Sequence, residues 1–204
     1  MGQLLFGLAK TSRPRQWIKN LALFASLIFT GQLFDKELVI ISTKAFFIFC
    51  AIASSNYFFN DVMDRDRDRR HPFKKLRPVA SGRVPVPTAL FTSALLLLGG
   101  IILSASINTS FLGMTLLFAF LSYSYTLVLK HVTVVDIFVI AMGYFLRVYA
   151  GEAATGYHLS IWLTLAVFSL SLFLAIGKRR SELTLLQTHD GAALKDTRAT
   201  LSHY

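Results

Sequence analysis

Long apolar segments separated by short polar stretches make up most of the chain. Each of six segments is close to the roughly 20 residues that a helix needs to cross a bilayer. They cover 17–34, 38–59, 88–107, 109–128, 134–152 and 159–177. We expect all six to be helical, because irregular backbone facing lipid would leave its polar groups unpaired. The pattern therefore predicts an all-α, polytopic membrane bundle with six transmembrane helices.

Composition supports a membrane protein. Apolar residues make up 54% of the 204 residues, and the mean hydropathy of +0.55 exceeds that of a typical soluble domain. A single cysteine, Cys50, excludes a disulfide within one chain. The sequence leaves the oligomeric state open.

The charge distribution indicates topology. A net charge of +10 could suggest nucleic acid, but the basic residues are distributed unevenly among the loops. If the N-terminus is cytoplasmic, 18 of the 21 lysines and arginines fall on the inner side, and only Lys36, Lys44 and Arg147 do not. This asymmetry follows the positive-inside rule. It predicts a multi-pass protein of the inner (plasma) membrane, with a cytoplasmic N-terminus and without nucleic acid as a partner.

Four aspartates lie where the second apolar segment ends, in "NDVMDRDRDRR" (60–70). If the helix continues through residue 68, a step of 100° per residue puts Asp61, Asp64 and Asp68 on one face and Asp66 on the opposite side. Three carboxylates on one stripe repel one another unless a cation lies among them, and such oxygen ligands suit Mg²⁺. The alternative is a solvated face of Asp–Arg pairs, which does not explain why Asn56 and Asn60 extend the same stripe.

Basic residues follow these acids in the same loop, which runs from 60 to 87: they are Lys74, Lys75, Arg77 and Arg83. Arginine offers a bidentate fork and lysine a point charge, and both bind phosphate groups. Acids for a metal and bases for phosphate, at one membrane face, favour chemistry on a diphosphate.

Several motifs then resemble one family. "NDVMDRDRD" (60–68) and "RPVASGRV" (77–84) are similar to the aspartate-rich segment of the UbiA superfamily of intramembrane prenyltransferases. "RPRQWIKNLALFASLIF" (13–29), "YSYTLVLK" (123–130) and "IGKRRSEL" (176–183) resemble its decaprenyl-phosphate phosphoribosyltransferase branch. Members of that branch move a phosphoribosyl group from phosphoribosyl diphosphate to a polyprenyl phosphate.

The resemblance implies roles for individual residues. Asp61, Asp64 and Asp68 would hold Mg²⁺ and act in catalysis together with Glu182. The remaining expected substrate-binding residues are Lys19, Asn56, Asn60, Lys74, Arg77, Tyr125, Lys130, Arg147, Lys178 and Arg179. The implied reaction is the departure of the donor's diphosphate, stabilised by Mg²⁺, followed by attack of a lipid phosphate oxygen on ribose C1.

Two intramembrane basic residues have alternative interpretations. Arg13, beside Trp17, is interpreted as an anchor in the headgroup region. Arg147 lies within an apolar segment, where a charge is rare and faces a cavity or a partner. Pairing with another helix and direct contact with substrate both remain open for Arg147.

The chain departs from the superfamily pattern at a second acidic motif, D-x-x-x-D. At that place it reads "KRRSE" (178–182), which leaves Glu182 as the acid and adds Lys178 and Arg179. The departure argues against the first alternative, transfer of a prenyl chain from its diphosphate to an aromatic acceptor, and suits a donor with an additional 5-phosphate. A non-catalytic scaffold or a transporter is the second alternative, although the sequence shows no internal repeat.

The resemblance also concerns length. Family members form a bundle of nine helices, so we expect residues 1–204 to be a single UbiA-type domain that is incomplete at its C-terminus. Its catalytic loops would be 60–87 and 178–204.

Overall fold

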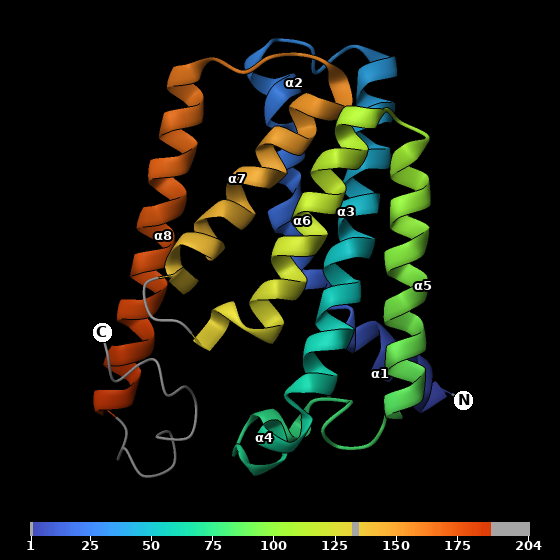
Figure 1. Ribbon diagram of the computed structural model, residues 1–204, viewed down its shortest axis with the longest axis vertical. Coiled ribbons are helices and arrows are strands. Elements are labelled where there is room, and N and C mark those ends of the chain that lie inside the picture. Colours follow the sequence, from blue (N-terminus) through green and yellow to red (C-terminus); the bar gives the residue numbers. More distant parts are fainter. Residues whose placement is uncertain (1, 132–134, 189–204) are drawn as a thin grey trace.

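The computed structural model describes residues 2–131 and 135–188, in which helices are joined by short loops (Figure 1). Beyond residue 177, side chains are described only for Arg180 and Ser181. The α-helices are α1 (Gly2–Thr11), α2 (Ala25–Phe29), α3 (Lys36–Met63), α4 (Arg65–Arg70), α5 (Val86–Ala105), α6 (Thr109–Leu127), α7 (Val135–Thr155) and α8 (Ile161–Thr188). The 3₁₀ helices are η1 (Pro14–Phe24), η2 (Lys74–Leu76) and η3 (Leu129–His131). The prediction of an all-α bundle is confirmed.

Helix α3 is the central element. It contacts α5, α6, α7 and η1, and it extends along much of the bundle in Figure 1. Its start is fixed by Asp35, whose side chain accepts hydrogen bonds from the backbone N–H groups of Glu37 and Leu38. At 1.5 Å per residue its 28 residues extend about 42 Å, which exceeds the thickness of the bilayer's hydrocarbon core. The last turn of α3 therefore emerges at the membrane surface.

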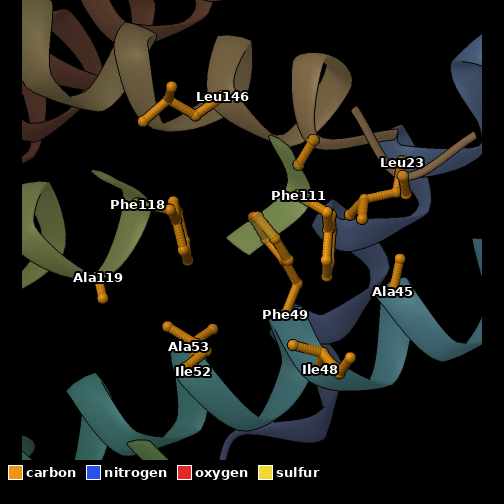
Figure 2. Close-up of a cluster of buried hydrophobic side chains, with 12 residues drawn as sticks. Leu23, Ala45, Ile48, Phe49, Ile52, Ala53, Phe111, Phe118, Ala119 and Leu146 are labelled. Atoms are coloured by element: carbon orange, nitrogen blue, oxygen red, sulfur yellow. The ribbon is translucent and has the colours of Figure 1, made fainter. Parts of the chain in front are cut away.

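The core is aromatic and lies between α3, α6, α7 and η1 (Figure 2). Phe49 of α3 stacks on Phe118 of α6 with a centroid distance of 4.9 Å and contacts Phe111 at 5.7 Å. Leu146 of α7 and Leu23 of η1 belong to the same cluster, and all five of these side chains are buried. These ring contacts hold α3 against α6, because Phe49 packs on two rings of α6 at once.

Small residues allow close helix contacts at two places. Gly100 of α5 lies against Ile52 of α3, where an added Cβ would come within 2.6 Å of the Ile52 side chain. Gly151 of α7 lies against the backbone of Leu23, and an added Cβ would come within 2.0 Å of the Leu23 carbonyl oxygen. The second contact presses η1 directly onto α7, as in other small-residue helix interfaces of membrane proteins.

The chain is an integral membrane protein, but the predicted number of six spans is not confirmed. Within the described residues, four helices are long and apolar enough to cross a bilayer: α3, α5, α6 and α7. The first predicted segment, 17–34, is divided between η1 and α2. The sixth corresponds to the apolar part of α8, Ile161–Gly177, which is shorter than the other spans. The first predicted segment thus differs from a membrane span in continuity, and the sixth differs in length.

Candidate active site

The predicted acidic stripe lies at the junction of α3 and α4. The expected continuous helix through residue 68 is wrong by one residue, because α3 ends at Met63 and α4 begins at Arg65. Asp64, with φ −90° and ψ 3°, joins the two, and hydrogen bonds from Asp64 N to Asn60 O and from Asp68 N to Asp64 O preserve the helical direction. The stripe therefore persists: Asp61 and Asp68 are buried, and Asp66 is exposed on the other side.

Arg77 joins the two buried carboxylates. Its Nη1 donates to Asp68 Oδ2 at 2.6 Å and lies 3.5 Å from Asp61 Oδ1. These two oxygens are consequently within about 6 Å of each other, because both contact the same nitrogen. Arg77 is thus placed between two acids that would otherwise repel each other.

The loop that carries Arg77 is held by short-range bonds and by packing. Arg69 Nε donates to Ala80 O at 3.0 Å, which ties α4 to this loop. Val79 and Val84 are buried against Phe58 of α3. Gly82 adopts a φ of 80°, a left-handed conformation that glycine reaches without strain, and lets the chain turn toward α5.

Arg13 is a residue whose role the sequence did not reveal. It donates a short hydrogen bond from Nη2 to Asp61 Oδ1, and its guanidinium lies over the Tyr57 ring at 4.8 Å. The interpretation of Arg13 as a headgroup anchor is therefore replaced by contact with the acidic stripe. Its backbone has φ 53° and ψ 61°, which is unusual for a residue other than glycine. Its position just before Pro14 was the one signal of a special turn.

Asp64 has a separate cationic partner. Lys130 Nζ, in η3, donates to Asp64 Oδ1 at 2.7 Å, and the Lys130 side chain is buried. One turn above, Thr126 Oγ1 donates to Asn56 Oδ1 at 3.0 Å. Both bonds join the C-terminal end of α6 and η3 to the C-terminal part of α3. The sequence placed Lys130 near the acids by resemblance alone, and the structure brings it into contact with one of them.

The other predicted residues fall in three groups. Asn60, Lys74 and Tyr125 are half-buried: Asn60 and Tyr125 near the C-terminal ends of α3 and α6, and Lys74 at the start of η2. Lys19 and Arg147 lie deeper in the bundle, apart from the aspartates. The remaining three belong to α8, and their side chains lie outside the described residues: Lys178, Arg179 and Glu182.

His71 follows α4 and has a defined protonation preference. Its Nδ1 accepts hydrogen bonds from the backbone N–H groups of Phe73 at 3.2 Å and Lys74 at 3.3 Å. Partial burial, followed by the nearby Lys74 charge, lowers the pKa of His71 below its usual 6.5. The neutral imidazole therefore helps to hold the turn that leads into η2.

The donor set fits a hard divalent cation. Among the described residues, no three His, Cys, Asp or Glu side chains gather closely enough to form a ready metal site. However, Asp61 and Asp68 present oxygens no more than about 6 Å apart, and Asp64 lies on the same stripe. Carboxylate oxygens are the ligands that Mg²⁺ takes, alongside waters and phosphates.

Known proteins resemble this chain over most of its length. Two of these relatives are decaprenyl-phosphate phosphoribosyltransferases: that of Mycolicibacterium smegmatis is 35% identical over 98% of this chain, and that of Corynebacterium glutamicum 36% over 93%. The chain spans 64% and 58%, respectively, of their lengths.

Among solved structures, a UbiA homolog from Archaeoglobus fulgidus bound to DMAPP and Mg²⁺ has the same fold, with a TM-score of 0.78. Its identity is 21%, and the match covers 96% of this chain and 69% of that chain. The sequence profile of the UbiA prenyltransferase family matches residues 21–181. By this match, the chain belongs to the UbiA prenyltransferase family.

Proposed function

We propose that the protein is a Mg²⁺-dependent transferase that moves a phosphoribosyl group from phosphoribosyl diphosphate to a polyprenyl phosphate. The observation that carries the proposal is the cluster in which Asp61, Asp64 and Asp68 each contact a basic side chain at one end of the bundle. The relatives that bear this activity in their names support the choice of donor and acceptor.

The cluster contains both parts that a diphosphate donor needs. The acids supply oxygen ligands, and Arg13, Arg77 and Lys130 supply N–H donors directed at the same small region. In the structure these cations neutralise the acids. When the acids bind a divalent cation, the same guanidinium and ammonium groups become available to phosphate oxygens, to which arginine can donate two parallel hydrogen bonds.

The chemical step then follows from charge. Bound Mg²⁺ would neutralise charge that develops on the departing diphosphate. Arg77 and Lys130 would hold that diphosphate in place, and preorganised donors of this kind stabilise most strongly where charge increases during the reaction. The acceptor phosphate is already anionic at neutral pH, so its oxygen attacks ribose C1 without a strong general base.

Localisation follows the same reasoning. We place the protein in the inner (plasma) membrane with the aspartate cluster on the cytoplasmic side. The basic loop between α3 and α5 supports this orientation through the positive-inside rule. The donor is a soluble, highly charged molecule, so a site on the aqueous side of the inner leaflet gives it access without crossing lipid.

The test is transfer of label from radiolabelled phosphoribosyl diphosphate to decaprenyl phosphate in nanodiscs, with Mg²⁺ or EDTA. Asp64→Asn should abolish transfer, whereas Asp66→Asn, which alters the exposed aspartate of the same segment, should leave it within about twofold. Equal activity of the two variants would refute the assigned role of the stripe.

A parallel reaction with geranyl diphosphate and 4-hydroxybenzoate tests the alternative of prenyl transfer. Product in this reaction alone would replace the proposed substrates with a prenyl donor and an aromatic acceptor. The same aspartate variants apply, because both reactions need the diphosphate to be held and neutralised.

A further inference from the structure

Arg147 is a buried cation within the membrane part of the bundle. It belongs to α7 and is 9% exposed. Its Nε donates to Asn20 Oδ1 of η1 at 2.8 Å, and its Nη1 donates to Gly143 O one helical turn earlier. Among the side chains that the structure describes, no carboxylate forms an ion pair with it. A guanidinium in this setting carries a charge that neutral amides and carbonyls only partly compensate.

A second cation lies on the same aromatic ring. The Arg147 guanidinium and the Lys19 ammonium are each 5.8 Å from the centroid of the Tyr144 ring. Arg147 also lies 4.7 Å from the Phe118 centroid. Lys19 is half-buried, and within the described part of the chain it too has no acidic partner. Two like charges near one ring repel each other, so an anion close to both of them would be favoured.

Arg147 and Lys19 do not contact the aspartates, but other side chains link the two groups. Asn20, which holds Arg147, also donates to Cys50 Sγ of α3 at 3.2 Å. Cys50 precedes Asp61 by eleven residues, or about 16 Å along the helix. Between the two levels lies Tyr57, whose ring faces Arg13 and whose hydroxyl is within electrostatic range of both Arg13 and Arg147. Basic and aromatic side chains thus extend from the acids into the bundle.

We propose that Arg147 and Lys19 form a second anion subsite, which takes a phosphate monoester rather than a diphosphate. The proposal rests on the proposed function, because that reaction brings together two phosphate monoesters: the lipid's phosphate and the 5-phosphate of the donor. Neither needs a metal where a guanidinium and an ammonium group lie near the same ring. Phe118 lies beside Arg147 and Tyr144 lies beside both cations, and apolar surroundings strengthen the attraction between opposite charges.

The first arm of the test measures lipid binding by native mass spectrometry of the 204-residue chain in detergent. The ratio of affinities for geranylgeranyl phosphate and geranylgeraniol isolates the phosphate, because the tails are the same. Arg147→Gln should lower the ratio about 10- to 100-fold, the range expected for a hydrogen bond to a charged group. Arg147→Lys should restore part of it, and Arg15→Gln, an exposed arginine of η1, should leave it unchanged.

The second arm compares phosphoribosyl diphosphate with inorganic diphosphate, both with Mg²⁺. A selective loss of affinity for phosphoribosyl diphosphate in Arg147→Gln would assign the subsite to the 5-phosphate of the donor, and a loss in the lipid arm would assign it to the acceptor. Either result supports the subsite. If the glutamine variant does not fold, Lys19→Gln is measured in the same two arms.

Unchanged ratios in both arms, in a variant that melts like the wild type, would overturn the proposal. If Arg147 had only a structural role, Arg147→Gln would lower thermal stability and weaken binding of the alcohol and of the lipid phosphate equally. The ratio of the two affinities would then stay the same. The proposed function fails by a different result, the absence of Mg²⁺-dependent binding of phosphoribosyl diphosphate to the wild type. The two failures are therefore distinguishable.

Discussion

The contact between Gly151 of α7 and the backbone of Leu23 gives the sharpest stability prediction. A Cβ at residue 151 would lie 2.0 Å from the Leu23 carbonyl oxygen and 2.8 Å from its carbonyl carbon. Ordinary contacts of a Cβ begin near 3.4 Å, so η1 and α7 would have to separate by more than 1 Å. Because the obstacle is backbone, no change of rotamer can relieve the clash.

The magnitude follows from two opposing effects. Overpacking of this kind costs about 1–3 kcal/mol, and sometimes more. Alanine also gains about 0.5–1 kcal/mol over glycine in a helix interior. Together these ranges give a net loss of about 0–2.5 kcal/mol for Gly151→Ala, and the central value of about 1.2 kcal/mol corresponds to a fall of about 2–5 °C in Tm for a chain of this size. The separation should also weaken the bond from Arg147 to Asn20, one turn away.

The assay is thermal unfolding in detergent, followed by circular dichroism, with Gly99→Ala of α5 as the matched control. No atom outside the helix lies within 4 Å of a Cβ added at Gly99, so that variant should keep or slightly raise the Tm. If the two variants melted at the same temperature, the close approach of η1 to α7 would be refuted.

Three further predictions concern the site and its surroundings. Arg77→Gln should lower stability by about 1–3 kcal/mol by leaving Asp61 and Asp68 without their shared cation, while the exposed Lys75→Gln should be neutral in the same denaturation experiment. Tyr123→Phe should cost about 1 kcal/mol, because the Tyr123 hydroxyl lies 2.5 Å from Ser55 Oγ and 3.1 Å from Ser93 Oγ; equal unfolding curves would contradict this. The pKa of His71, followed by NMR against the exposed His158, should lie below 6.5. The pKa of His71 is lower in the folded protein than in the unfolded chain. The contribution of neutral His71 to folding stability is therefore complete above pH 6.5 and is lost as the pH falls through the pKa of the folded state.

The part of the site that could be predicted from the sequence is the part that depends on neighbouring residues. Asp61, Asp64 and Asp68 share a face because residues three and four apart in a helix do so, and this spacing is written in the sequence. The break at Asp64 did not disturb the stripe, since its hydrogen bonds keep the helical direction. The exposed position of Asp66 followed from the same angle.

The partners of these acids depended on the packing of distant segments. Arg13 is 48 residues from Asp61, and Lys130 is 66 residues from Asp64. Residue types alone made Arg13 an anchor at the headgroups, because nothing local indicates which way the side chain of this left-handed residue points. The resemblance brought Lys130 to the site, but without a specific partner.

The sequence by itself determined the helical apolar segments, the acidic stripe and the basic loop that follows it, because each depends on composition or on the helical period over a few residues. The tertiary structure decided which cation neutralises which acid, and it joined Asn20 to Arg147 across 127 residues. It also divided the first apolar segment into η1 and α2. These features depend on how closely helices approach, as at Gly151, and that distance is set by side chains from several helices at once.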